Sequence, residues 1–332
     1  MSLVRIFALI GLAILIALPA VTPVYFLHLL IQILIWSFIY TAWALMGRFG
    51  FVSFGHGAFM GVGAYVPALL WSYYGLTPWV GIPLGVFLSA LLALVIGYPC
   101  FRLRVVGHYF ALVTLALSQV VLLSLTAARD ITGGSLGFTP KAAGHSWYAL
   151  QFTDKSYFYG IALVLWLVGL YVWQRIDRGI NREALEAISE DEDAAAAVGI
   201  DVLREKLRVT VISASLTALG GAIYGQYFMY LNPDTVSGIA VSLQIVFAVI
   251  AGGVYSLLGP TVGSLLTLSL TEALRVWFGT NFIGAANTIY GILLILCIIF
   301  MPQGIVGALK RVRLRREAKV VPAERSTHGL ST

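Results

Sequence analysis

Long stretches without a charged side chain dominate this sequence and limit what it can fold into. The longest is 49–101, which holds 53 consecutive positions without Asp, Glu, Lys or Arg, and others are 6–47, 209–233, 235–271 and 276–309. A helix needs about 20 mainly apolar residues to cross the hydrocarbon core of a bilayer. Because these runs offer little polar surface to water, the sequence predicts an integral membrane protein.

The composition supports this interpretation. Hydrophobic residues make up 59% of the chain and charged residues 11%, whereas a soluble domain has about 25% charged residues. The net charge of +6 does not indicate nucleic-acid binding, because the basic residues flank apolar runs and are better explained as topology determinants. Membrane lipid is therefore an expected partner, and nucleic acid is not.

Proline and glycine mark the turns at which the longer runs fold back, at 19–23, 75–78, 259–260 and 279–284. We therefore predict an all-α, polytopic membrane bundle of about ten transmembrane helices. Their expected ranges are 6–21, 25–46, 54–74, 79–100, 107–128, 157–174, 208–231, 239–258, 260–278 and 285–304.

The basic residues predict how this bundle is oriented. With the N-terminus inside, 17 of the 21 Lys and Arg residues fall on the cytoplasmic side, as the positive-inside rule requires. Both termini are then cytoplasmic. Residues 1–22 are expected to remain as a span, although a cleaved signal peptide is the alternative.

The same topology predicts the organisation of the chain. Residues 1–309 are expected to form the transmembrane domain, with an external loop at 129–156 and a cytoplasmic charged loop at 174–208. Residues 310–332 are basic and then rich in small polar residues, which predicts a disordered cytoplasmic tail that contacts anionic lipid.

The charged loop 174–208 is the most polar part of the chain, with six of the 21 basic and nine of the 15 acidic residues. We predict one helix over 181–199, with Asn181 as its N-cap and Gly199 at its C′ position. Leu185 and Ile188 form a small apolar face that we expect to dock into a groove on a soluble subunit. A merely solvated loop is the alternative.

Small residues form a stripe on the third predicted helix, where Ser53, Gly57, Gly61 and Ala64 recur at helical spacing. Such a stripe permits close helix packing. The alternative is that this stretch departs from regular helix and lines a solute pathway, because irregular backbone at membrane depth occurs only around cavities or inside protein. His56 is then either a hydrogen-bonded residue of the bundle or a polar wall of the pathway.

Two further sets of polar residues lie within predicted helices. Thr114, Ser118 and Gln119 share one face of the fifth helix, where they either bond to a neighbouring helix or face solute. Glu272 and Arg275 are three residues apart near the outer end of the ninth helix. We interpret them as a structural ion pair, with a gate as the alternative.

The sequence also lacks several catalytic patterns. It contains no Gly-Lys dipeptide and hence no Walker A loop, and no pair of histidines at metal-binding spacing. Residues 133–137 have the G-x-S-x-G spacing but fall in the expected external loop, so they do not form the strand-to-helix elbow of a hydrolase. We therefore expect no catalytic residues, no metal site and no cofactor bound by this chain.

Several motifs, in order, closely resemble the branched-chain amino-acid ABC transporter permeases, specifically the LivM-type membrane subunit. The matching stretches are Ser53-Phe54-Gly55-His56-Gly57, Gly107-His108-Tyr109-Phe110-Ala111, Thr132-Gly133-Gly134-Ser135, Ala187-Ile188-Ser189-Glu190-Asp191-Glu192, Gly252-Gly253 to Gly259-Pro260, and Phe300-Met301-Pro302-Gln303-Gly304. Together they extend over most of residues 40–308.

This resemblance implies a subunit of a bacterial inner-membrane importer of branched-chain or other amino acids. The implied partners are a second related permease, two ATPase subunits that bind ATP and Mg, and a periplasmic solute-binding protein. Permeases for urea and short amides share the same resemblance, and an ion-coupled secondary transporter is the alternative from another class. Glu272 is the one acidic residue predicted within a span, whereas ion coupling usually needs paired carboxylates or a proton relay.

The resemblance also implies two functional sites. In such importers an E-A-A-x-x-x-G element docks on the ATPase, and here Asp193 replaces its Glu, while the Leu-Pro of the wider motif is absent at Val211-Ile212. The coupling residues are then Leu185, Ile188, Glu190, Asp193, Ala194, Ala195 and Gly199. The solute pathway is expected at Ser53, Gly55, His56, Gly57, Tyr109, Thr114, Ser118 and Gln119.

Overall fold

The chain is a helical bundle. The computed structural model describes residues 3–105, 107–278, 288–289, 291–292, 295–296, 299, 304–308 and 311. These residues form no β-strand, only two isolated bridges, which confirms the all-α class. The main helices are α1 (Leu3–Val21), α2 (Val24–Gly47), α3 (His56–Tyr74), α4 (Pro78–Arg102), α5 (His108–Ala127), α7 (Lys155–Asp177), α8 (Ile180–Glu190), α9 (Glu192–Ala197), α10 (Val202–Phe228), α12 (Gly238–Gly252) and α13 (Gly259–Phe278).

Six segments of the described chain are long and apolar enough to cross a membrane. They are α2, α4, α5, α7, α10 and Pro233–Gly252, which joins the short α11 (Pro233–Val236) to α12. The chain is thus a multi-pass membrane protein, while the total of ten spans stays a prediction. The predicted helix 285–304 and the tail 310–332 lie outside the described residues except at a few positions.

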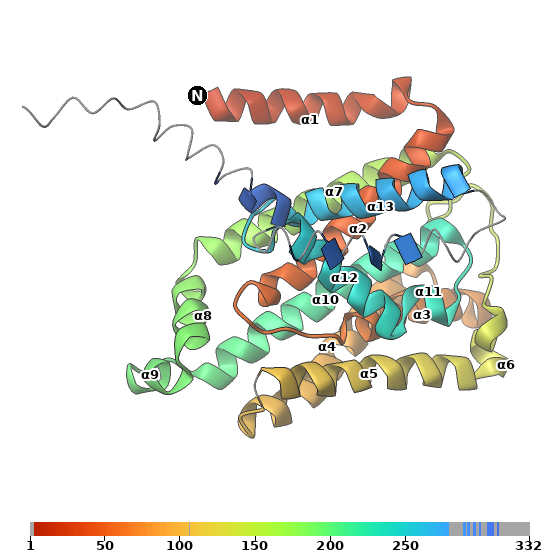
Figure 1. Ribbon diagram of the computed structural model, residues 1–332. Coiled ribbons are helices and arrows are strands. Elements are labelled where there is room, and N and C mark those ends of the chain that lie inside the picture. Colours follow the sequence, from red (N-terminus) through yellow and green to blue (C-terminus); the bar gives the residue numbers. More distant parts are fainter. Residues whose placement is uncertain are drawn as a thin grey trace, which may run out of the picture.

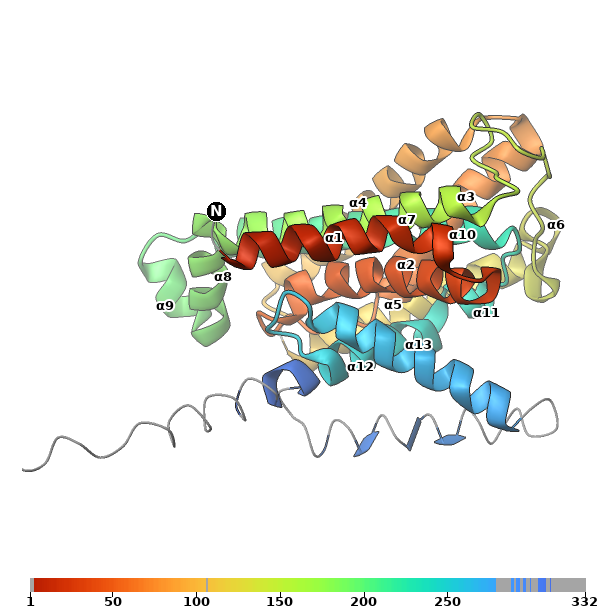
Figure 2. The same ribbon diagram turned by 90° about the horizontal axis from the view of Figure 1, so that it is seen from above.

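Helix α2 is the core of the bundle. It packs against α7, α10, α12 and α13, and nearly all of its side chains from Ile31 to Met46 are buried. Helix α3 packs in turn against α4, α5, α10 and α12. Helix α1 lies along the outside beside α7 (Figure 2), where the Tyr159 hydroxyl donates to the Leu15 carbonyl at 2.8 Å.

Capping side chains set where several helices begin. Pro78 is the first residue of α4, where a missing N–H has no cost, and Thr77 caps the Trp79 N–H. Asp201 caps the Arg204 N–H at 3.0 Å, so α10 begins at Val202. The predicted start at 208 was therefore wrong, because the Asp201 cap starts the helix at Val202, six residues earlier than predicted.

The predicted helix 239–258 also ends early. Helix α12 stops at Gly252, and Gly253 has φ +120°, a backbone conformation that favours glycine. A turn through Gly253 to Leu258 then leads into α13. The apolar composition of this turn concealed it from a hydropathy argument.

The two ends of the bundle differ in character. Helices α8 and α9 and the N-terminus of the chain lie at one end, whereas the short α6 (Arg129–Thr132) and the loop up to α7 lie at the other (Figure 1). The charged loop and the expected external loop are thus at opposite ends, which agrees with the predicted topology. The structure contains no membrane, and the orientation itself stays a prediction.

Candidate functional site

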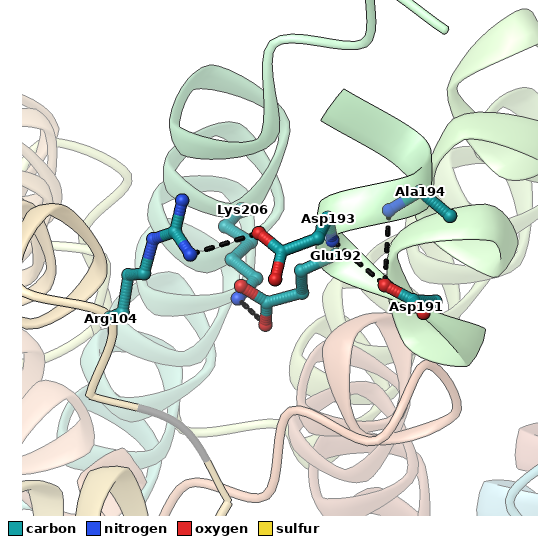
Figure 3. Close-up of polar contacts among 6 residues, drawn as sticks. All are labelled: Arg104, Asp191, Glu192, Asp193, Ala194 and Lys206. Carbon is teal, nitrogen blue, oxygen red and sulfur yellow. Dashed lines mark hydrogen bonds and ion pairs between the residues drawn. The ribbon is translucent and has the colours of Figure 1, made fainter. Parts of the chain in front are cut away.

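The charged loop folds into two short helices rather than the one predicted over 181–199. Helix α8 ends at Glu190, and Asp191 is extended, with φ −155° and ψ 115°. The Asp191 carboxylate accepts from the backbone N–H of Asp193 at 2.9 Å and of Ala194 at 3.0 Å (Figure 3). The continuous helix was therefore a wrong prediction, because an aspartate that caps the next helix cannot stay in helical conformation itself.

Of the two ends predicted for this segment, the N-terminal one was wrong and the C-terminal one is confirmed. Helix α8 begins at Ile180 with Gly179 as its N-cap, so Asn181 lies inside the helix and is not its cap. At the other end Gly199 has φ +93°, and the N–H groups of Gly199 and Ile200 bond to Ala196 and Ala195 at 3.0 and 3.1 Å. This is a Schellman motif, and it confirms Gly199 at the C′ position.

Leu185 and Ile188 do not face outward. Each is 2% exposed, and Leu185 packs in a cluster with Met46, Phe49 and Val209. The prediction that they anchor a soluble partner is wrong, because burying this apolar face against the end of the bundle removes it from water. The two residues instead hold α8 on the membrane domain.

Both α8 and α9 contribute to the outer surface of the segment. Glu190, Asp193 and Ala194 are exposed, whereas Ala195 is buried against the chain. Val198, which follows α9, is 78% exposed. Val198 was not among the predicted coupling residues, and the sequence did not single it out because isolated apolar residues are common on protein surfaces.

Two ion pairs tie α9 to the membrane helices (Figure 3). Asp193 accepts from Arg104, in the turn between α4 and α5, at 2.9 Å, and both side chains are exposed. Glu192 accepts from Lys206 near the start of α10, and Lys206 is 2% exposed. An exposed pair contributes about 0–1 kcal/mol. Breaking a fully buried pair costs about 3–5 kcal/mol, and this pair lies between the two cases because the Glu192 side chain is 31% exposed. The Glu192–Lys206 pair is therefore the stronger tie.

Sequence reasoning assigned Lys206 to the solvated loop. The helical spacing of Lys206, Thr210, Ser213 and Thr217 places it on the buried face of α10. That spacing was present in the sequence. The burial of Lys206 also depends on Glu192 and on the rings of Phe51 and Phe101, which are distant in the sequence.

A third ion pair ties the end of α2 to this region. The Arg48 side chain donates to Asp177 at 3.0 Å and lies over the Trp173 ring, 4.2 Å from its centroid. Arg182 lies 3.6 Å from the same carboxylate. Burial lowers the pKa of Arg48 from its ordinary value, and the charge of Asp177 opposes that shift.

Several predicted pathway residues come together in one hydrogen-bonded cluster. The Gly57 N–H donates to Ser242 Oγ at 2.9 Å, which lies 3.0 Å from Ser118 Oγ. The Phe54 N–H donates to Thr114 Oγ1 at 3.0 Å, and Gly55 N–H donates to Ser53 Oγ at 3.1 Å. These bonds join α3, α5 and α12, as the helix-packing alternative requires, and a pathway at these residues stays a prediction.

His56 is fully buried beside this cluster. The Ser213 hydroxyl donates to the Ala42 carbonyl at 2.7 Å, so in the neutral ring His56 Nε2–H donates to Ser213 Oγ at 2.8 Å. Nδ1 is then an acceptor, and it has no hydrogen-bond partner among the described residues. Tyr109, which is 74% exposed, and the half-buried Gln119 have no recorded bond to this cluster.

Glu272 and Arg275 form the ion pair that their spacing predicts, at 3.5 Å. The Tyr25 hydroxyl donates to the same Glu272 carboxylate at 2.5 Å and so links α2 to α13. This second partner supports a structural role for the pair. No cluster of His, Cys, Asp and Glu suited to a metal ion occurs in the part of the chain that the structure describes.

The known proteins that this chain resembles are branched-chain amino acid transport permeases. The LivM high-affinity branched-chain amino acid transport permease proteins of Salmonella typhimurium and Escherichia coli K12 are each 29% identical to this chain, over 79% of its length and 65% of theirs. A probable LivH permease protein of Methanocaldococcus jannaschii is 25% identical over 77% of this chain and 82% of its own. No solved structure matches.

The chain therefore spans about two thirds, 65%, of the length of the LivM relatives. The sequence profile described as "Branched-chain amino acid transport system / permease component" matches residues 25–301. That range includes every helix from α2 to α13, except the first residue of α2, and both ion pairs that hold α9. The chain belongs to this family of branched-chain amino acid transport permeases.

Proposed function

We propose that this chain is the membrane permease subunit of an ATP-driven ABC importer that moves branched-chain or other amino acids across the inner membrane. Family membership supports this, together with the six apolar helices long enough to span a bilayer. The observation on which the proposal chiefly depends is α9, a short exposed helix that is tied by ion pairs to α10 and to the α4–α5 turn.

The proposed assembly contains a second related permease, two ATPase subunits and a periplasmic solute-binding protein. ATP and Mg bind to the ATPase subunits, and this chain has no ATPase site of its own. Its termini and α8–α9 are cytoplasmic, and the loop 129–156 is periplasmic. The printed names of the LivM and LivH relatives, which are both permeases, support the pairing of two permease chains.

The proposed mechanism is alternating access without covalent chemistry. ATP binding brings the two ATPase subunits together and moves α9, which they contact through Val198 and the exposed side of the helix. The Glu192–Lys206 pair passes this displacement to α10, because breaking it would leave a buried ammonium without its counterion. Helix α10 packs along α3 and α4, so its movement rearranges the helices at the predicted pathway.

Uptake measurements test the proposal. Cells that express the chain together with a second permease, two ATPase subunits and a solute-binding protein of this importer class are expected to accumulate leucine, and inhibition of ATP hydrolysis should stop the accumulation. Urea and acetamide uptake in the same cells distinguishes the alternative substrates. Leucine uptake that a protonophore abolishes while cellular ATP is maintained would instead indicate the ion-coupled transporter.

Val198→Asp tests the docking surface. Because Val198 is exposed, a charge there is tolerated by the fold but must be desolvated in an apolar contact. We expect the variant to reach the membrane in normal amounts, to lose co-purification with the ATPase subunits and to lose uptake. Val198→Leu, which keeps an apolar contact, is the matched control. Normal co-purification and uptake by Val198→Asp would contradict docking at this surface.

A further inference from the structure

A cavity of about 190 Å³ lies between α9 and the membrane helices. Its lining comes from the chain after α2, the turn between α4 and α5, helix α8 and the start of α10, and includes Phe51, Phe101, Phe110, Ser189, Glu192 and Lys206. The lining contains none of the predicted pathway residues and one of the predicted coupling residues, Ile188. The cavity lies at the end of the bundle that the proposed function places in the cytoplasm.

The cavity contains the buried half of the Glu192–Lys206 ion pair in an aromatic setting. The Lys206 ammonium lies 5.4 Å from the centroid of the Phe51 ring and 5.6 Å from that of Phe101. A buried ion pair is a poor source of stability, because well-packed apolar residues of similar volume often stabilise a protein as well or better. Both charged side chains line the cavity, so a ligand inside it can reach each of them.

The chemistry of the lining specifies a ligand. A carboxylate can accept from Lys206 and an ammonium can donate to Glu192, so one molecule with both groups replaces each partner of the ion pair by an equivalent charge. The cavity stays neutral overall, which limits the electrostatic cost of binding. Phenylalanine rings, two valines and Ile188 form most of the remaining lining and suit an apolar side chain, while Ser189 adds a hydroxyl.

Other small solutes satisfy this lining less well. Urea and short amides are uncharged, and their neutral hydrogen bonds do not compensate for separating Lys206 from Glu192. A simple anion satisfies Lys206 but is repelled by Glu192. Among the substrate classes that the sequence leaves open, the lining favours a free amino acid.

We propose that this cavity is a binding site for apolar amino acids in their zwitterionic form, occupied on the release side of the permease. The proposal rests on the proposed function, because only an amino-acid importer presents this solute at that end of the bundle. Occupancy separates Glu192 from Lys206 and so loosens α9 from α10. A site for the transported solute therefore lies within the connection between the ATPase contact and the membrane helices.

Chemical protection inside the cavity tests the proposal on the complete purified importer. Ser189, an exposed residue of the lining, is replaced by cysteine in a Cys100→Ser/Cys297→Ser background, and its modification by a maleimide is timed. L-leucine is expected to slow the reaction.

Two analogues of leucine test which groups the site recognises. Leucinamide lacks the carboxylate and 4-methylpentanoate lacks the ammonium. Each loses one charge-assisted bond, so half-protection should need at least about tenfold more of either compound.

A double variant tests whether the ion pair is the determinant. Lys206→Met/Glu192→Gln removes both charges and leaves neither alone, so it is expected to fold and to lose protection by leucine. Arg204→Met removes an exposed cation two residues earlier on α10 and should keep protection at the wild-type level. The comparison among ligands is made in the Ser189→Cys protein itself and does not depend on the folding of the double variant.

The outcomes separate the two proposals. Protection by leucinamide or urea equal to that by leucine, or unchanged protection in the double variant, overturns the binding site. ATP-driven leucine uptake without any protection by leucine also overturns the site, but it leaves the importer function intact. Absence of amino-acid uptake by the assembled importer overturns the proposed function, and the claim that the site serves a transported solute fails with it.

Discussion

At the scale of single residues, the environment of a charge matters more than its position in the sequence. Asp193 and Glu192 are neighbours, but Asp193 pairs at an exposed site and Glu192 pairs with a buried lysine. The sequence predicted Asp193 from a motif and missed Lys206. The burial of Lys206 depends on Phe51 and Phe101, which are distant in the sequence.

This difference predicts unequal costs for two similar substitutions. Glu192→Gln leaves the Lys206 ammonium buried without a counterion, and because Glu192 itself is 31% exposed it should lower the free energy of unfolding by less than the about 3–5 kcal/mol of a fully buried pair. Asp193→Asn breaks the exposed pair and should cost no more than about 1 kcal/mol. Thermal unfolding of the purified variants, followed by fluorescence-detected size exclusion, measures both. Adding Lys206→Met to Glu192→Gln should restore most of the loss, and equal midpoints for the two single variants would contradict this account.

At the scale of helices, sequence patterns predicted which segments are helical better than where they end. Apolar runs located α2, α3, α4, α5, α7, α10, α12 and α13, because burial in lipid or in protein selects long apolar stretches. The ends at Val202, Gly252 and Glu190 depend on capping carboxylates and on a glycine with positive φ. These local features oppose the hydropathy pattern and were missed.

Glycines of α3 pack closely against neighbouring segments, both at Gly61 of the predicted stripe and at Gly63 outside it. A Cβ atom built on Gly61 would lie 2.8 Å from the Ser237 Cβ, and one built on Gly63 would meet the backbone of Ala218 on α10 at less than ordinary contact distance. Gly63→Ala should therefore force α3 and α10 apart and lower the thermal midpoint and the yield of folded protein. Gly160→Ala in α7 is the matched control, since open space surrounds Gly160 and alanine favours a helix by about 1 kcal/mol over glycine. Equal midpoints for the two variants would exclude a tight α3–α10 contact.

At the scale of the whole molecule, the arrangement of the two ends follows from the charge distribution and agrees with the fold. The charged segment α8–α9 and the N-terminus share one end, and the loop after α5 lies at the other. The sequence predicted this separation because basic residues are retained on the cytoplasmic side. It did not reveal the cavity beneath α9, since that space exists only once four distant segments have packed together.

The orientation of the molecule in the membrane gives the last prediction. In a Cys100→Ser/Cys297→Ser background, Leu136→Cys and Val198→Cys introduce single thiols at exposed positions near the two ends. A membrane-impermeant maleimide has no access to the cytoplasm of an intact spheroplast. Leu136→Cys should therefore react in intact spheroplasts, whereas Val198→Cys should react only after permeabilisation. The reverse pattern would place α9 outside the cell, away from any ATP, and would contradict both the topology and the importer. Reaction of both thiols in intact spheroplasts would show that the two ends are not on opposite sides of the membrane.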